Sequence, residues 1–180
     1  MRKLLLIISS IFFLGYHSFG QNQVFKPLTH EIMVKLKKVG APVISPDGKF
    51  IVYSQVETSY NLDEQTTDLW LAPSDGKTSP RRITSSKSGE DNYFWSPSGD
   101  KIYFTSTINS GVNRDFCSTT ISNGKTSRLT SGDGVHTAFF NAETENFIDN
   151  FSSLNTPRII KVVSSQGKDI KTLLTAENPL

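Results

Sequence analysis

The residues of this chain that could carry acid–base chemistry are its histidines and their acidic neighbours. Of the three histidines, His17 lies in an apolar N-terminal stretch and His30 at the start of a predicted helix, which leaves His136. A histidine acts as a general base when an acid orients it and a nucleophile lies within hydrogen-bond reach. Asp149 comes near His136 only if a hairpin joins the two segments, and no serine stands in a Gly-x-Ser-x-Gly elbow. We therefore interpret His136, which follows Asp133-Gly134-Val135, as a turn histidine without a catalytic role.

Metal and cofactor motifs are also missing from the sequence. There is no Cys-x-x-Cys, no His-x-x-x-His and no calcium loop of alternating Asp and Asn closed by Glu. We predict that Gly132 and Gly134 lie inside a hairpin, which excludes a glycine-rich phosphate cradle between a strand and a helix. The single cysteine, Cys117, cannot form an internal disulfide, and we interpret it as a half-buried strand residue. The sequence therefore predicts no catalytic, metal-binding or cofactor-binding residue.

A repeat organises most of the chain. Its first copy opens on Ser45-Pro46-Asp47-Gly48-Lys49 and its second on Ser96-Pro97-Ser98-Gly99-Asp100, 51 residues later. A third, more degenerate copy passes through Asn141-Ala142-Glu143, where the Pro and Gly are lost. The copies end on threonines 46 and 45 residues apart, Thr84, Thr130 and Thr175. Such a period is typical of the blades of a β-propeller, which repeat every ~40–50 residues.

The pattern within each copy predicts four short antiparallel strands. Short apolar runs alternate with clusters of Gly, Pro, Asn, Asp and Ser, as expected of hairpin-connected strands. The runs at 50–53 and 102–104 are apolar on both alternating faces, which indicates sheets packed between neighbouring sheets, and we expect Trp95 to be buried at a blade face. We therefore predict an all-β fold, a partial propeller of about three blades at about 41–84, 92–130 and 137–175, followed by a tail at 176–180.

The first twenty residues read as a signal peptide. Arg2 and Lys3 precede the apolar stretch from Leu4 to Leu14, and Ser18-Phe19-Gly20 supplies small residues for cleavage before Gln21. The alternative is an uncleaved membrane anchor, but serines interrupt the stretch, which is shorter than the ~20 apolar residues that a spanning helix needs. No cysteine follows at the cleavage site, which argues against a lipid anchor. We expect export to the periplasm or the outside of the cell, without stable membrane insertion after cleavage.

The segment 21–40 that follows is expected to contain one short helix. The helix begins after Thr29, has Glu31 in its first turn and ends at Gly40. Four apolar residues share one face, which we expect to pack against the propeller: Ile32, Met33, Leu36 and Val39. Lys35, Lys37 and Lys38 gather at its C-terminal end, where the helix dipole favours them. The net charge of +2 lies largely in the leader, so nothing in the charge pattern predicts a nucleic-acid partner.

The repeat motifs resemble those of a known enzyme family. From Phe25 to Ser106 the chain resembles the first blades of exported peptidases of the prolyl oligopeptidase family, on the motifs Asp68-Leu69-Trp70-Leu71 and Trp95-Ser96-Pro97-Ser98-Gly99, and TolB-like propellers share much of this pattern. From Leu129 to Leu180, Gly134-Val135-His136 and Phe147-Ile148-Asp149 look like the last propeller blade of bacterial dipeptidyl peptidase IV-type enzymes.

The resemblance implies a non-catalytic part of such an enzyme. In that family the last blade leads into an α/β-hydrolase domain, which would begin at Asn178-Pro179-Leu180, and the propeller usually has seven or eight blades. The catalytic Ser, Asp and His and the pair of adjacent Glu residues that hold a substrate amino terminus have no counterpart in this sequence. Glu90-Asp91 is acidic but stands in a different context, so no functional residue is carried over.

Two functions remain open at this point. The chain is either the propeller region of an exported serine peptidase, where it limits access to a hydrolase site, or a TolB-like protein-binding propeller without a peptidase link. In both cases we expect a peptide or protein ligand. Because three blades leave two apolar faces without a neighbour, we also expect self-association through the open blade faces.

Overall fold

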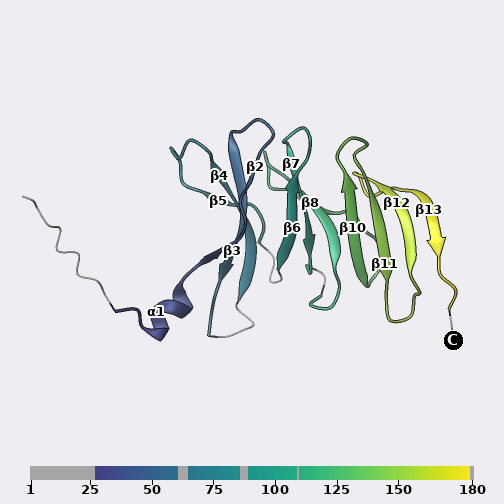
Figure 1. The fold of residues 1–180 in the computed structure, drawn as a ribbon, viewed down its shortest axis with the longest axis horizontal. Coiled ribbons are helices and arrows are strands. Elements are labelled where there is room, and N and C mark those ends of the chain that lie inside the picture. The colour runs from purple at the N-terminus through teal and green to yellow at the C-terminus, as the bar shows by residue number, and fades with distance from the viewer. Residues whose placement is uncertain (1–26, 61–64, 86–88, 109, 179–180) are drawn as a thin grey trace, which may run out of the picture.

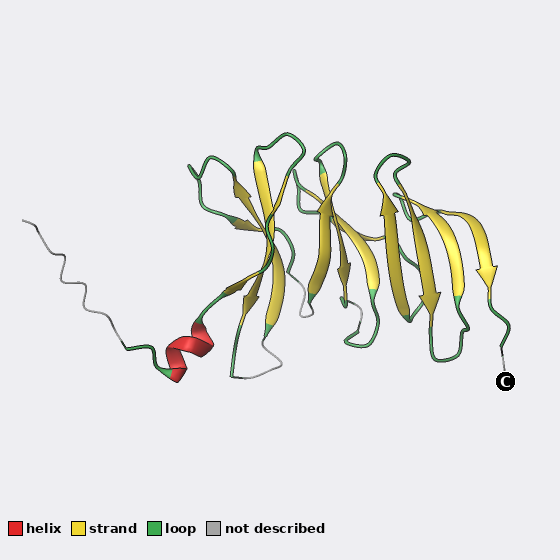
Figure 2. Ribbon diagram, in the orientation of Figure 1, coloured by secondary structure: helices red, strands yellow, loops and turns green. Residues whose placement is uncertain are grey.

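The computed structural model describes residues 27–60, 65–85, 89–108 and 110–178, and it is an all-β structure with one short helix. Three antiparallel sheets stand side by side in chain order, each built from consecutive strands (Figure 1). Colouring by secondary structure shows that strands make up almost all of the regular structure (Figure 2). The predicted fold class is therefore confirmed. The predicted signal peptide at 1–20 lies outside the described residues.

Blade 1 contains five strands because its first strand is broken into two. The strands are β1 (Lys38–Val39), β2 (Val43–Ile44), β3 (Phe50–Glu57), β4 (Thr66–Pro73) and β5 (Arg81–Arg82), and both β1 and β2 pair with β3. At the break, the Gly40 N–H donates to the Ser54 carbonyl at 2.8 Å. A Cβ on Gly40 would lie 2.2 Å from the Ser54 hydroxyl oxygen, so a larger residue would require that hydroxyl to move. Gly40 thus interrupts a strand, and the prediction that it ends a helix was wrong.

Blades 2 and 3 are four-stranded sheets paired in sequence order. Blade 2 consists of β6 (Glu90–Trp95), β7 (Lys101–Ser106), β8 (Asp115–Thr120) and β9 (Thr126–Arg128). Blade 3 consists of β10 (Val135–Asn141), β11 (Asn146–Ser152), β12 (Ile159–Ser164) and β13 (Asp169–Thr175). In each blade the first strand, which is β1 with β2 in blade 1, lies at one edge of its sheet and pairs there with the next strand; we call it the inner strand.

The first turn of each blade shows how the repeat motif folds. In blade 1, Gly48 has a φ of 72° and its N–H donates to the Ser45 carbonyl at 2.9 Å, while the Ser45 hydroxyl donates to Asp47 at 2.7 Å. Blade 2 repeats this geometry at Ser96 and Gly99. Blade 3 lacks the motif, and there the Asn141 side chain accepts from two backbone N–H groups, at 2.9 and 3.1 Å. An amide side chain thus replaces the lost Pro and Gly.

Two seams, defined as the packed interfaces between adjacent blades, contain the hydrophobic core. The first seam, between blades 1 and 2, buries Val52, Leu69, Leu71, Ile83, Trp95, Ile102, Phe104 and Cys117. The second seam, between blades 2 and 3, buries Tyr103, Phe116, Leu129, Phe147 and Val163, with Phe94, Ala138 and Phe140 packed against them. Consecutive residues of β7 are at most 2% exposed, which confirms that this strand is covered on both faces. Each large apolar side chain buried in this way contributes about 1.5–3 kcal/mol to stability.

The helix α1 (His30–Lys35) differs from its prediction in length and packing. The Thr29 hydroxyl caps it as expected by accepting from the Ile32 N–H at 3.3 Å. The helix ends before Lys38, because Lys38 and Val39 pair with β3 as a strand. The four apolar residues expected to pack on the propeller are instead exposed, by 37% to 63%: Ile32, Met33, Leu36 and Val39. In the described chain the helix is attached through the Thr58 hydroxyl, which donates to the carbonyls of Val34 and Leu36.

The outer face of blade 3 has no neighbouring sheet in the described structure. Because Phe147 and Val163 face the second seam, alternation along β11 and β12 places Ile148 and Val162 on the opposite face. Phe139 lies beside Ile148 on that face and is 60% exposed. The face is therefore apolar and open.

Candidate functional site

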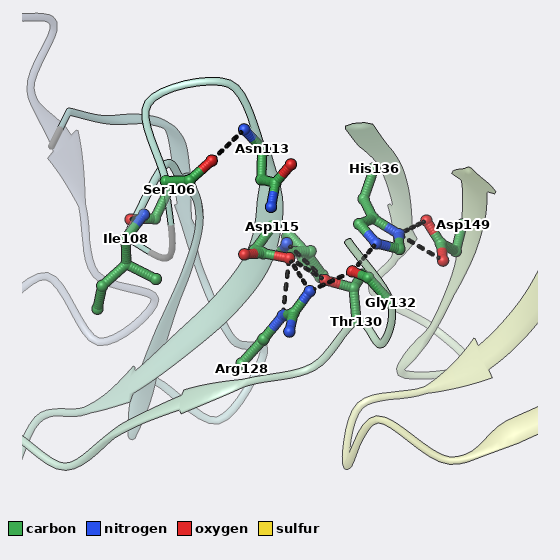
Figure 3. A network of polar contacts seen from close by, with 11 residues as sticks. Ser106, Ile108, Asn113, Asp115, Arg128, Thr130, Gly132, His136 and Asp149 are labelled. Carbon is green, nitrogen blue, oxygen red and sulfur yellow. Dashed lines mark hydrogen bonds and ion pairs between the residues drawn. The ribbon is translucent and has the colours of Figure 1, made fainter. Parts of the chain in front are cut away.

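The polar network with the most buried ionisable groups crosses the second seam (Figure 3). His136 in β10 is 2% exposed, and its Nδ1 lies 3.0 and 2.9 Å from the two carboxylate oxygens of Asp149 in β11. Its Nε2 lies 3.3 Å from the Gly132 carbonyl oxygen. The Phe151 ring stacks on the imidazole with centroids 4.5 Å apart. The histidine is thus enclosed on two edges and one face.

Blade 2 contributes the other half of this network. Asp115, at the start of β8, is fully buried and accepts from Arg128 Nε at 2.7 Å and from the Thr130 hydroxyl at 3.2 Å. The Thr130 hydroxyl oxygen in turn accepts from the Phe116 N–H at 3.2 Å. Arg128 also donates to the Gly132 carbonyl, the same oxygen that faces His136. A continuous polar path therefore joins the end of blade 2 to the first two strands of blade 3.

Glycine is required in the loop that closes this site. Gly134 has a φ of 156°, and a Cβ there would lie 2.5 Å from the Ser152 carbonyl oxygen and 2.8 Å from the Phe151 ring. Gly132 has a φ of 98°, in the region that favours glycine. Both glycines lie in the connection from β9 to β10, between two blades, so the prediction that they lie inside a hairpin was wrong.

The position of His136 corrects the sequence interpretation, since the residue lies in a strand rather than in a turn. The β10–β11 hairpin does bring Asp149 to it. His136 pairs with Phe151 in β11, and Asp149 is two residues before Phe151 in the same strand. A general base must offer one nitrogen to a substrate or nucleophile. Here Nδ1 faces the carboxylate and Nε2 faces a backbone carbonyl, and the ring is almost fully buried. This geometry suits a structural cross-link between two strands and a loop.

The first seam holds an equivalent network built from different residues. Register pairs Glu90 with Ser106 and His136 with Phe151, which places Glu90 in blade 2 where His136 stands in blade 3. Glu90 is 3% exposed and accepts from the Thr84 hydroxyl at 2.9 Å. The Thr84 hydroxyl oxygen accepts from the Leu69 N–H at 2.8 Å. The exit of each of the first two blades is thus fixed to the next blade by a buried polar group.

An Asp–Arg pair accompanies each of these exits. Arg82 lies 2.6 Å from Asp68 in blade 1, and Arg128 lies 2.7 Å from Asp115 in blade 2, with both carboxylates buried. In the sequence, these pairs correspond to an Arg-x-Thr ending preceded by an aspartate near the start of β4 or β8, and only the first two repeat copies contain this pattern. Blade 3 has Leu173 and Thr175 at the corresponding ending, with Leu173 half exposed.

The acidic pair Glu90-Asp91 borders a cavity of about 230 Å³ at one end of the first seam. Asp91 forms an ion pair with Arg114 at 3.1 Å, and Glu90 is held by Thr84. Both carboxylates are therefore engaged in the fold.

Metal and thiol chemistry have little support in the described residues. Within them, no cluster of three His, Cys, Asp or Glu side chains is arranged to hold a metal ion. Cys117 is 1% exposed, so it is more deeply buried than the half-buried residue that we expected. Burial, followed by the nearby Asp115 charge, raises the pKa of its thiol to about 12. None of the helices in the described part of the chain has the length and apolar character needed to span a membrane.

Known proteins share both the sequence pattern and the fold. The family model for the dipeptidyl peptidase IV (DPP IV) N-terminal region matches residues 60–158. Dipeptidyl peptidase 4 from Porphyromonas gingivalis is 23% identical with a TM-score of 0.59, over 75% of this chain and 18% of that protein. A putative dipeptidyl aminopeptidase IV from Bacteroides ovatus is 14% identical with a TM-score of 0.55, over 79% of this chain and 30% of that protein.

TolB from Acinetobacter baumannii is similar as well, at 16% identity and a TM-score of 0.51, over 77% of this chain and 33% of TolB. At these identities the structural similarity establishes the fold. The chain spans a third or less of the length of each of these three proteins.

Proposed function

Because the chain belongs to the dipeptidyl peptidase IV N-terminal region family, we propose that it is the non-catalytic propeller region of an exported serine peptidase of the prolyl oligopeptidase family. Its role is to limit which peptides reach a hydrolase active site, or to bind a peptide or protein itself. The observation that carries this proposal is that His136 is enclosed in the seam, where its two ring nitrogens face Asp149 and the Gly132 carbonyl. A chain whose best candidate base is engaged in this way supplies packing surfaces rather than catalysis.

The second candidate is a TolB-like protein-binding propeller with no peptidase link. The similarity to TolB at a TM-score of 0.51 favours it. The two functions require different partners for the propeller. The peptidase role requires a hydrolase domain in the same polypeptide or gene region, whereas the TolB-like role requires only a protein partner.

The proposed function includes export from the cytoplasm and association through the outer face of blade 3. The basic and apolar N-terminal stretch supports export to the periplasm or outside of the cell. The open outer face of blade 3, with Phe139 and Leu174 exposed by 60% and 46%, supports association with a further blade or with a second copy.

The test combines the gene with the protein. The DNA downstream of the Leu180 codon is read in all frames for a hydrolase segment with Gly-x-Ser-x-Gly, and the mature chain is purified from the exported fraction. We expect the hydrolase segment to be found, and we expect the isolated chain to show no turnover of dipeptidyl chromogenic substrates. Joined to the hydrolase segment, the chain should permit cleavage of short peptides and exclude folded proteins.

Two outcomes would contradict this function. Turnover by the isolated chain that a serine-directed reagent blocks would show that the chain contains a catalytic nucleophile. The absence of any hydrolase segment in the gene region would favour the TolB-like alternative.

A further inference from the structure

The inner strands of the three blades differ in how well their free edges are protected. An edge strand presents unpaired N–H and C=O groups that can pair with another chain, and proteins usually blunt such edges with Pro, bulges or breaks. Blade 1 has its break at Gly40 followed by Pro42. In blade 2, the β6 register shifts between Asp91 and Phe94, and Asn92 adopts a φ of 49°, as in a bulge.

Strand β10 of blade 3 carries none of these protections. All seven of its residues pair with β11 in unbroken register, from Val135 with Ser152 to Asn141 with Asn146. It contains no proline, and its one ionisable residue, His136, is buried against Asp149. The other edge of the same blade, β13, is disrupted by two register shifts. Strand β10 is therefore the longest regular edge of blade 3.

The backbone groups that point outward from this edge can be identified. The His136 N–H donates to the Arg114 carbonyl at 2.9 Å, on the side away from β11. Outward and inward groups alternate along an antiparallel strand, so Ala138 and Phe140 also direct their N–H and C=O groups away from β11. Among the described residues, β10 pairs on this side only with Arg114, through the isolated bridge at Val135. The groups of Ala138 and Phe140 therefore form a free run beyond that bridge.

The side chains along the edge indicate that the part of a ligand lying against them is uncharged and apolar. Phe139 is 60% exposed on the outer face, with Thr137 beside it and exposed as well. On the other face, Ala138 and Phe140 are half-buried against the second seam. A cavity of about 430 Å³ lies at the beginning of β10, lined among others by Gly134, Val135 and Leu154. It can receive the end of a chain that lies along the strand.

We propose that β10 binds an extended peptide by strand addition, with backbone bonds to Ala138 and Phe140 and apolar contact with Phe139. The occupant is a single peptide segment that is apolar at alternate positions. The inner strand β6 lies beside β10, with the Phe94 and Phe140 rings 5.3 Å apart. A single peptide strand can lie next to the Phe94 and Phe140 rings. A second copy that paired through its own β10 would also have to place its β6 in the same space. The proposal rests on the edge geometry and does not require a hydrolase domain.

The first test changes the ligand. The probe is a fluorescein-labelled peptide, acetyl-Lys-Thr-Val-Thr-Val-Thr-Lys-amide, with binding to the mature chain measured by fluorescence anisotropy. Two matched probes carry N-methyl groups on both valines or on the first two threonines. Because only alternate N–H groups of an added strand face the protein edge, one N-methylated probe should keep its affinity and the other should lose it at least tenfold. Equal binding by all three probes, or binding by none, would overturn strand addition.

The second test changes the protein at the edge. Ala138→Pro removes an outward N–H that β11 does not use, and an edge strand tolerates proline at such a position. We expect Ala138→Pro to reduce peptide affinity at least tenfold, while the control Ala138→Val, which keeps the N–H, retains it. Circular dichroism and thermal melting check the fold, and if Ala138→Pro does not fold, the N-methylated probes decide the question on the unaltered chain.

Analytical ultracentrifugation of the chain alone separates the competing occupant. A dimer that Ala138→Pro abolishes would show that a second copy fills the edge, and it would overturn the peptide proposal. A failure of peptide binding leaves the peptidase role to be judged by the gene and turnover test.

Discussion

The first seam joins its blades through mainly aliphatic side chains and bonds to backbone, whereas the second joins them through aromatic rings and a buried histidine–carboxylate pair. In the first seam, the Trp95 indole donates to the Val43 carbonyl at 3.0 Å and the Tyr93 hydroxyl donates to the Ala41 carbonyl at 2.5 Å. In the second, the Tyr103 ring lies 4.5 Å from Phe140 and Phe116 lies 4.8 Å from Phe147. The architecture is the same, so it does not depend on one set of core residues.

The two seams differ most clearly at one position. Glu90 is the first residue of β6 and His136 the second residue of β10, and both are at most 3% exposed. Glu90 accepts from Thr84, while His136 faces the Gly132 carbonyl and Asp149. What the two seams share is a buried polar group that receives the end of the preceding blade. The group is a carboxyl in one seam and an imidazole in the other, which indicates that the fold requires a polar connection here and not a particular side chain.

The largest effect is expected in the aromatic seam. Phe147→Ala should lower the free energy of unfolding by about 3–5 kcal/mol, because the ring is 1% exposed and its loss leaves a cavity beside Phe116. Phe139→Ala, on the opposite and open face of the same sheet, should change the free energy of unfolding by less than about 1 kcal/mol. Urea denaturation of both variants makes the measurement. Equal losses would mean that the outer face is packed in solution, as self-association requires.

A smaller effect is expected in the first seam. Trp95→Phe keeps most of the buried ring and removes the bond to Val43, which leaves a carbonyl without its donor and costs about 1–2 kcal/mol. Cys117 reports on this seam, because burial holds its pKa near 12 and a thiol reagent reaches it only when the seam opens. We expect Trp95→Phe to raise the labelling rate of Cys117 about tenfold.

The same thiol tests whether the seams are independent. Blades that contact only their neighbours open locally, so Phe147→Ala should raise Cys117 labelling much less than its loss of stability would imply. An increase in the Cys117 labelling rate in proportion to the stability lost in Phe147→Ala would show that both seams open together. The different side chains of the two seams would then not give them separate stabilities.

The repeat could be predicted because its signals are local. A turn such as Asp47-Gly48 and an apolar run such as 102–104 determine strands and hairpins within a few residues, and the structure confirms them. The position of His136 could not be predicted in the same way, since the adjacent glycines read as a turn while the polar partner comes from another strand. The helix failed for a related reason, because pairing of Lys38 and Val39 with β3 overrides the helical pattern.

The smallest effect concerns the first hairpin turn of each blade, which follows the first strand. Hydrogen bonds from the Ser45 hydroxyl and the Lys49 N–H lower the pKa of Asp47 from 3.8 to about 2, whereas blade 3 holds its turn with the amide of Asn141, which does not titrate. A lowered folded-state pKa stabilises the fold above the unfolded value, and this contribution is lost as the pH falls from about 4 through about 2.

The melting temperature of Asp47→Asn should therefore fall below that of the unaltered chain at pH 6 and meet it near pH 2. Asn141→Asp is the matched variant in blade 3, and the bonds from Glu143 and Thr144 that now reach Asn141 should make its stability rise with pH across the same range. If the melting temperatures of Asp47→Asn and the unaltered chain differ by the same amount from pH 6 to pH 2, the Asp47 charge does not stabilise the turn. The three turns would then differ in sequence alone.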